Sequence, residues 1–154
     1  MEKKSSLIII RPMEIHDLHT VFLMGVDMFR SINGLRYYGR WNEENLAELF
    51  AGFPEYALVA SRKKQLLGFA LGGVIQGPDT ADAGYILWSA VKDREKFQGI
   101  REMLLGALFT VMRAGGLKTI RCPMDSGDTI LETWCRKNGF LSTEHDSIAK
   151  WFSE

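Results

Sequence analysis

The chain has 154 residues, a length that suits one domain. Its 19 basic and 19 acidic residues balance, which argues against a general nucleic-acid binder, because such proteins usually carry a basic excess. No apolar run approaches the ~18 residues of a membrane-spanning helix, and Leu7–Ile10 is too short for the core of a signal peptide. We therefore expect a single cytoplasmic domain over residues 1–154, with residues 1–6 disordered.

The cysteines and histidines do not indicate a metal site or a disulfide framework. Cys122 and Cys135 lack the CxxC spacing of metal and redox motifs, so we expect two reduced thiols, as in a cytoplasmic protein. His16 and His19 share one helix face, but no cluster of carboxylates accompanies them. We expect no bound metal.

The first third of the chain predicts a strand and two helices. The β-branched run Leu7–Arg11, which Pro12 stops, predicts the strand. Apolar residues recur at helical spacing over Glu14–Ser31 and predict an amphipathic helix. The second helix is predicted over Glu43–Phe50, because Asn42 is a good N-cap and early acidic residues suit the helix dipole.

A hairpin and a buried strand follow. Tyr56–Ala60 and Leu66–Ile75 predict paired strands, because a short charged turn separates them. Gly72–Gly73 indicates a bulge or a close backbone approach within the second of these strands. The mostly apolar run Ala83–Val91 predicts a strand that is buried on both faces.

The last third contains the strongest helical pattern of the chain. Apolar residues recur over Ile100–Met112, and Gly115–Gly116 supplies a C-cap signature. The remaining elements are a strand over Lys118–Cys122, a helix from Asp128 to Asn138, and a closing hairpin of Phe140–Thr143 and Ile148–Phe152. This order predicts an α/β (α+β) fold, with a mixed central sheet of about seven strands and about four helices on both faces.

The segment Ala90–Arg101 carries the clearest chemical signal. A buried strand ends at Val91, a charged loop follows, and a helix begins near Gly99. The unpaired amides and the positive dipole end of a first helical turn suit a phosphate or pyrophosphate. Four basic residues surround this turn: Lys92, Arg94, Lys96 and Arg101. The spacing matches neither a Walker loop nor a dinucleotide fingerprint, and an ordinary loop with solvated charges is the alternative.

Several segments, in this order, resemble the GNAT N-acetyltransferase family, and the similarity covers nearly the whole chain. Ile10–Leu18 is similar to the family's first strand and helix start, and Phe69–Gly72 looks like its third strand. Lys96–Arg101 has the spacing of the family signature [QR]-x-x-G-x-[GA]. Asp128–Phe140 resembles the family's N-x-x-A-x-x-F-Y-x-K-x-G-F helix.

This resemblance implies the GNAT fold and acetyl-CoA as cosubstrate. The sheet of the family splays between its fourth and fifth strands, here Ala83–Val91 and Lys118–Cys122, and the pantetheine arm lies in that gap. The pyrophosphate would rest on backbone amides of residues 97–101. The residues implied in cofactor binding are Ala90, Val91, Lys96, Phe97, Gln98, Gly99, Ile100, Arg101 and Asp128.

The sequence departs from the family pattern at three of these positions. Lys96 replaces glutamine or arginine and retains charge. Arg101 stands where the family has a small residue, so its guanidinium either takes a phosphate oxygen or points away. Asp128 replaces a common asparagine and is expected to cap its helix in any case.

The catalytic groups are less clearly indicated. The family mechanism is direct attack of an amine on the thioester, with a base to take the amine proton and an acid to protonate the leaving thiolate. Cys135 occupies the position of the family's tyrosine acid, so it is either a general acid or a small packing residue. No residue of the chain is assigned as the base.

The acceptor side of the family lies in the loop between the first two helices. The residues predicted to bind the acceptor are Arg36, Tyr37, Tyr38 and Trp41 from this loop and Tyr85 from a central strand. The arginines of the loop weakly favour an acidic or carboxylate-bearing acceptor. The alternative is that some of these aromatic side chains cover the core.

These observations predict an N-acetyltransferase that moves an acetyl group from acetyl-CoA to a primary amine of a small molecule or protein. Two alternatives remain open: a non-catalytic CoA-binding or sensory module, and a GNAT-like interaction domain. We expect neither nucleic acid nor a membrane as partner, and a homodimer is left open.

Overall fold

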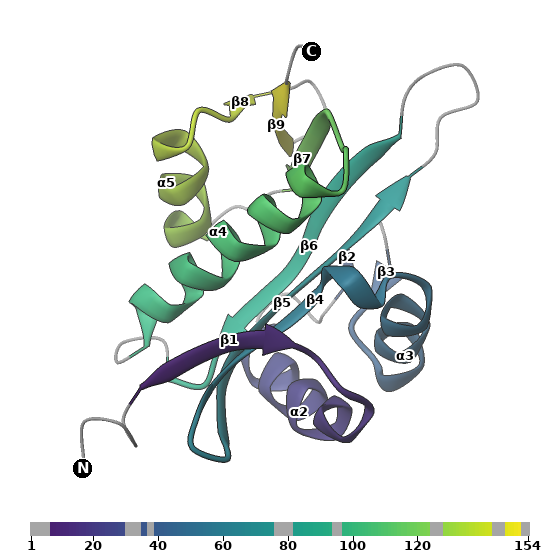
Figure 1. The fold of residues 1–154 in the computed structure, drawn as a ribbon, viewed down its shortest axis with the longest axis vertical. Helices are drawn as coiled ribbons and strands as arrows, with labels where there is room; N and C mark the ends of the chain where they lie inside the picture. The colour runs from purple at the N-terminus through teal and green to yellow at the C-terminus, as the bar shows by residue number, and fades with distance from the viewer. Residues whose placement is uncertain are drawn as a thin grey trace.

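The computed structural model describes residues 7–29, 35–36, 39–75, 82–93, 97–123, 128–142 and 147–151. The strands of its main sheet are β1 Ile8–Pro12, β4 Ala57–Arg62, β5 Gln65–Ile75, β6 Ala83–Val91, β7 Thr119–Pro123, β8 Leu141–Ser142 and β9 Ser147–Trp151. These seven strands lie in the order β1-β4-β5-β6-β7-β9-β8 (Figure 1). Neighbours are antiparallel except β6 and β7, which are parallel.

Helices cover both faces of this sheet, so the predicted fold class is confirmed. The four α-helices of the described residues are α2 Leu18–Phe29, α3 Glu43–Gly52, α4 Gln98–Ala114 and α5 Thr129–Lys137. Helices α2 and α3 lie on one face, and α4 and α5 lie on the other (Figure 1). None of the helices in the described ranges is long and apolar enough to cross a membrane.

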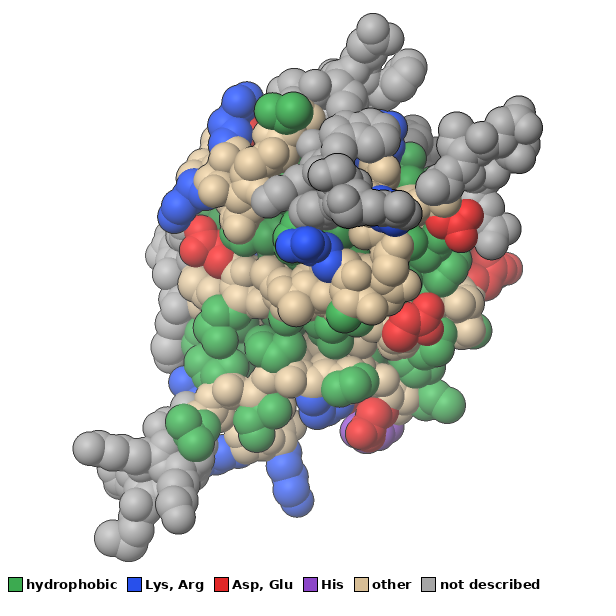
Figure 2. Space-filling view, turned by 45° about the horizontal axis from the view of Figure 1, so that its top comes forward, with side chains coloured by type: hydrophobic (Ala, Val, Ile, Leu, Met, Phe, Trp, Pro, Cys, Tyr) green, Lys and Arg blue, Asp and Glu red, His purple; other side chains and the backbone are tan. Residues whose placement is uncertain are grey.

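Two clusters of buried side chains fill the space between the sheet and its helices. On the face of α2 and α3, buried residues include Val21, Phe29, Trp41, Phe69 and Trp88. On the face of α4 and α5, they include Leu67, Ile86, Leu104, Leu108 and Trp134. Figure 2 shows hydrophobic and acidic side chains between separate groups of Lys and Arg on one face of the molecule.

The predicted caps are confirmed. The Asn42 side chain accepts a hydrogen bond from the Asn45 amide at 2.7 Å and caps α3. Helix α4 is followed by a turn containing Gly116, whose φ of +92° lies in the left-handed region that favours glycine. Residues 1–6, predicted to be disordered, lie outside the described residues.

The first predicted helix begins differently from the prediction, and its last predicted residues, 30–31, lie outside the described residues. It starts as a 3-10 turn, η1 Ile15–Asp17, and α2 then runs to Phe29. The Asp17 carboxylate accepts the Glu14 amide at 2.8 Å, which fixes the chain at this start. A second difference is a small hairpin of β2 Leu35–Arg36 and β3 Gly39–Arg40, which the sequence did not predict.

A bulge interrupts the pairing of β5 and β6 next to Gly72, as predicted. Leu71 pairs with Trp88 and Gly72 pairs with Ile86, so Leu87 is the extra residue and the bulged strand is β6. A Cβ on Gly72 would lie 2.6 Å from the Tyr85 carbonyl oxygen. The close backbone approach predicted at this glycine is therefore confirmed as well.

Candidate functional site

The two central parallel strands part soon after they meet. Strands β6 and β7 pair only from Ala83 with Thr119 to Tyr85 with Arg121. Strand β6 continues to Val91, and beyond Tyr85 no described strand pairs with it on the β7 side. The predicted splay between the fourth and fifth strands of the sheet is therefore present.

Tyr85 lies at the point where the strands part. Its neighbours Gly84 and Ile86 face α4, because a Cβ on Gly84 would meet Met112 and Ile86 belongs to the core on that side. Side chains alternate along a strand, so the half-buried Tyr85 faces the side of α2 and α3. This position agrees with its predicted role toward the acceptor, which stays a prediction.

The first turn of α4 lies beyond the end of β6 and follows the loop that begins at Lys92. Three of its amides already donate to backbone oxygens: Phe97 to Asp93 at 2.7 Å, and Ile100 and Arg101 to Phe97 at 3.0 and 3.3 Å. The pyrophosphate was expected on the amides of residues 97–101. Since three of these amides already donate within the chain, the amides of Gln98 and Gly99 remain as candidates. A Cβ on Gly99 would meet no atom within 4 Å, so the packing of the chain itself does not require a glycine there.

Most of the residues predicted to bind the cofactor have buried side chains. Ala90, Val91, Phe97, Ile100 and Arg101 are all buried. A ligand at this segment would therefore meet backbone groups, as the resemblance implied, but the amides of Phe97 and Ile100 already donate within the chain. Lys96 lies outside the described residues, and only the backbone of Gln98 is described.

Arg101 turns inward, and its side chain is only 3% exposed. This placement agrees with the alternative that the side chain points away from the phosphate, and its contact with the cofactor stays a prediction. Its two terminal nitrogens donate to the two carboxylate oxygens of Asp128 at 2.9 and 2.7 Å, and Nε donates to Ser89 Oγ at 3.0 Å. Sequence reasoning missed Ser89, whose only signal is a polar residue in a largely apolar strand.

Asp128 has two structural tasks. Its side chain accepts the Leu131 amide at 3.2 Å, so the predicted N-cap of α5 is confirmed. The same carboxylate is the partner of Arg101. Its predicted contact with the cofactor stays a prediction, since both carboxylate oxygens already accept hydrogen bonds within the chain.

Cys135 is fully buried, and this placement supports the packing interpretation. It lies against Cys122 of β7, also fully buried, and the two thiols form a hydrogen bond. This bond, together with burial, raises the pKa of the Cys122 thiol well above its ordinary value. The role of Cys135 as a general acid stays a prediction.

Trp41 is a core residue, which supports the alternative that some of the loop aromatics cover the core, and its role in acceptor binding stays a prediction. The indole is 8% exposed, stacks on Phe69 at 5.4 Å between ring centroids, and donates from Nε1 to the Phe22 carbonyl oxygen at 3.0 Å. Tyr37 and Tyr38 lie outside the described residues. For Arg36, only its backbone place in β2 is described.

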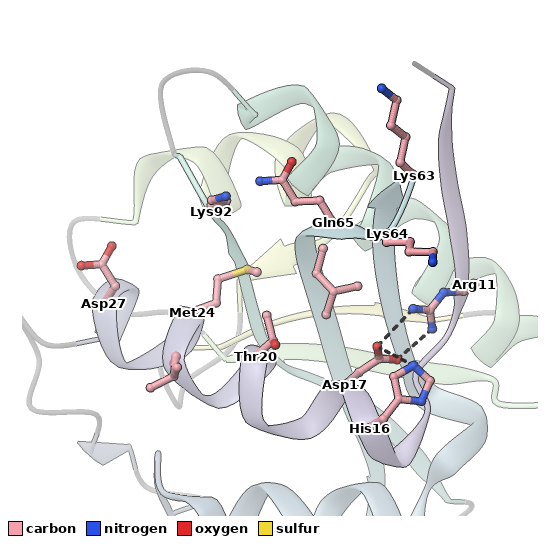
Figure 3. Close-up of a pocket in the computed structure, with 12 residues that line it drawn as sticks. Arg11, His16, Asp17, Thr20, Met24, Asp27, Lys63, Lys64, Gln65 and Lys92 are labelled. Atoms are coloured by element: carbon pink, nitrogen blue, oxygen red, sulfur yellow. Dashed lines mark hydrogen bonds and ion pairs between the residues drawn. The ribbon is translucent and has the colours of Figure 1, made fainter. Parts of the chain in front are cut away.

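A cavity of about 860 Å³ opens elsewhere, between α2 and the turn that joins β4 to β5 (Figure 3). Its lining includes the charged residues Arg11, Asp17, Asp27, Lys63, Lys64 and Lys92, and also His16. Of the described residues in the segment 90–101, Lys92 alone reaches it. The cavity is therefore distinct from the first turn of α4.

An ion pair between the partly exposed Arg11 and the buried Asp17 lies at one end of this cavity. The Arg11 guanidinium donates to both oxygens of Asp17, at 2.8 and 3.1 Å (Figure 3). Burial alone would raise the pKa of Asp17, but hydrogen bonds from Arg11 and the Glu14 amide outweigh burial and lower it. The described residues contain no group of three or more His, Cys, Asp or Glu side chains that could hold a metal ion.

No protein-family model and no curated protein matches the sequence. Solved structures do match. A ribosomal-protein-alanine N-acetyltransferase from Brucella melitensis has a TM-score of 0.75 at 17% identity, over 94% of this chain and 99% of that chain. A GNAT family acetyltransferase from the same organism, in complex with acetyl-CoA, has a TM-score of 0.69 at 18% identity, over 96% and 90%. The chain has the GNAT fold.

A third GNAT-fold neighbour extends the likeness to another organism. The PaiA N-acetyltransferase of Thermoplasma acidophilum, solved in complex with coenzyme A, has a TM-score of 0.72 at 18% identity, over 95% of this chain and 99% of that chain. At these identities the likeness establishes the GNAT fold, and chemistry has to be argued from the site.

Proposed function

We propose that this protein is an acyl-CoA-dependent N-acyltransferase, which uses acetyl-CoA to acetylate a primary amine of a small molecule or protein. The observation that carries this proposal is the parting of β6 from β7 close to the first turn of α4. The end of β6, beyond its described pairs with β7, and the start of α4 together offer backbone donors and acceptors to one extended ligand.

The backbone, more than the side chains, would bind acetyl-CoA. The backbone of β6 near Val91 lies beyond Tyr85, where the described pairing with β7 ends, and it suits the amides of the pantetheine arm. The amides of Gln98 and Gly99 suit the pyrophosphate, and the open space beside Gly99 lets a ligand approach the backbone closely. Two neighbours that share this fold are complexes with acetyl-CoA and coenzyme A.

Acetyl-CoA supplies a thioester. The amine nitrogen of the acceptor bonds to the acyl carbon of the thioester as the carbon–sulfur bond breaks. The nitrogen gives up a proton, and the leaving sulfur gains one. The protein would hold the reacting groups together in the gap, which replaces a bimolecular encounter by a positioned one. Tyr85 stands at the narrow end of this gap, on the side of α2 and α3. It is the half-buried polar side chain best placed to meet an acceptor.

A non-catalytic CoA-binding module is the second candidate, and one observation favours it. Cys135, at the position of the family's acid, is fully buried. Such a module would bind acetyl-CoA through the same backbone groups but would not turn it over. Measured turnover therefore separates the two candidates.

Binding is tested first by thermal unfolding with acetyl-CoA. A ligand at a hundred times its Kd adds about 2.7 kcal/mol to the free energy of unfolding, which corresponds to about 5–10 °C in Tm for a domain of this size. An unchanged Tm at millimolar acetyl-CoA would contradict both candidates. A panel of amines, with released CoA thiol as the readout, then separates the acyltransferase from the module.

A further inference from the structure

We infer that Arg101 is a positioning residue, whose ion pair with Asp128 holds the two sides of the β6–β7 gap at the separation that acetyl-CoA needs. This inference rests on the proposed function. Arg101, Asp128 and Ser89 together are named the clasp. None of the three has to touch the reacting atoms for the clasp to act.

The clasp joins elements that backbone pairing does not join. Ser89 lies on β6, beyond Tyr85, the last residue of β6 that pairs with β7. Arg101 lies in the first turn of α4. Asp128 caps α5, whose buried Cys135 packs against Cys122 of β7. A single guanidinium therefore ties β6 and α4, on one side of the gap, to α5 on the other.

The geometry of the clasp is strong and specific. The guanidinium meets the carboxylate through two parallel bonds of 2.9 and 2.7 Å, a planar match that lysine could not make. A third bond of 3.0 Å runs from Nε to Ser89. Arg101 is 3% exposed and the Asp128 side chain 13%, so water screens the pair poorly. Removing one partner leaves a buried charge without its counter-charge.

The clasp also links two departures from the sequence pattern. The chain has arginine where the resembled signature has a small residue, and aspartate where asparagine is common. These two unusual residues are each other's partners.

The direction of the side chain gives the clasp its role in binding. Arg101 turns inward, so it does not cover the amides of Gln98 and Gly99. It fixes the turn that carries those amides relative to β6 and α5. Binding sites lose affinity when such supporting contacts allow the groups that bind to shift.

The test uses Arg101→Ala, Asp128→Asn and the double variant in the full chain. Asparagine keeps an oxygen to cap α5, so Asp128→Asn removes the charge and spares the cap. Each single variant breaks the ion pair of the clasp, and we expect the Kd for acetyl-CoA to rise about tenfold. The double variant lacks the same ion pair, so we expect its Kd to match that of the single variants, because the second substitution has no further contact of the pair to remove.

Calorimetry at a temperature where each variant is folded, checked by NMR spectra, measures affinity apart from stability. The matched control is Glu132→Gln with Arg136→Ala, which removes an exposed Arg–carboxylate pair from α5 and should leave the Kd unchanged. If Arg101→Ala fails to fold, Arg101→Lys takes its place, because lysine keeps the charge and loses the parallel bonds.

The outcomes separate this inference from the proposed function. If the parent protein does not bind acetyl-CoA, the proposed function and the inference about Arg101 are both contradicted. If the parent binds and the single variants bind as tightly, or if the double variant binds as tightly as the parent, the clasp alone is overturned. Single variants that bind about tenfold more weakly, with a double variant that binds like them, support it.

Discussion

The indole ring of Trp41 occupies the space that a side chain on Gly25 would need. Gly25 lies in the middle of α2, where a glycine weakens the helix by about 1 kcal/mol relative to alanine. The ring gains close contact with the helix in exchange, and its other contacts reach Phe69 and Trp88 of the sheet. Trp41 thus joins α2 to the sheet, and its ring can lie against the helix because Gly25 has no side chain.

Gly25→Ala is therefore expected to destabilise the protein, although alanine is the better helix former. A methyl group at this position overlaps a rigid ring, and overpacking of this kind costs about 1–3 kcal/mol. Gly106→Ala in α4 is the matched control, because a Cβ there meets nothing within 4 Å. It should stabilise by about 0.4–1 kcal/mol. Urea unfolding measures both, and a stabilised Gly25→Ala would contradict the contact.

The Arg11–Asp17 pair should make stability depend on pH in the acid range. The folded protein holds the pKa of Asp17 below its ordinary value, so the unfolded chain takes up the proton first. The stabilisation is complete above the unfolded pKa of about 3.9 and is lost as pH falls through the lower folded pKa. Asp17→Asn should be less stable at pH 7 and lose less stability on acidification than the parent. Exposed Asp82→Asn is the control, measured by urea unfolding from pH 7 to pH 2.5.

Substitutions at Gly99 test the helix start as the anion site. Proline is tolerated in a first helical turn but has no amide hydrogen, so Gly99→Pro should fold and should lose the rise in Tm that acetyl-CoA produces. Gly99→Ala keeps the amide and meets no neighbour, so it should retain more of that rise. An undiminished rise in Gly99→Pro would show that this amide does not bind the ligand.

The two buried thiols should react only when the protein unfolds. Cys122 and Cys135 are fully buried, and the pKa of Cys122 is raised by its hydrogen bond with Cys135 and by burial. The thiolate is the reactive form, so a disulfide reagent at pH 8 should modify no cysteine in the native protein and both in urea. Rapid modification under native conditions would contradict this burial.

Cys135→Ala separates packing from catalysis. If the thiol only packs, its removal should cost about 1 kcal/mol through a small cavity and leave kcat unchanged once an acceptor amine is known. If it protonates the leaving thiolate, kcat should fall with no change in acetyl-CoA affinity, since acid catalysis is worth about 10²-fold or more. Conservative Cys135→Ser controls for the loss of volume.

Local signals in the sequence predicted local structure well. The strand Ala83–Val91 was predicted with the bounds it has, because a compact apolar run and its flanking turns define it. The caps at Asn42 and Asp128 were predicted too, since a cap depends on residues within three positions. The splay of the sheet followed from the family resemblance and is confirmed by the pairing of β6 and β7.

Features that depend on distant partners were not predictable. The direction of Arg101 depends on Asp128, which belongs to another helix. Trp41 reads as an exposed aromatic residue in a loop until α2 and the sheet close around it. The bulge near Gly72 was foreseen, but its extra residue, Leu87, belongs to the partner strand, and only strand register reveals it.

The uneven pairing of the sheet has a consequence for how the molecule opens. Eight residue pairs join β5 to β6, whereas three join β6 to β7. The two halves are held mainly by side chains, such as the ion pair of Arg101 and the contact of Trp134 with Phe109 at 6.4 Å between ring centroids. Local unfolding tends to separate parts of a protein that few backbone hydrogen bonds join. The amide hydrogens of β7, α5 and β9 should therefore exchange with solvent as one unit, before those of β4, β5 and β6.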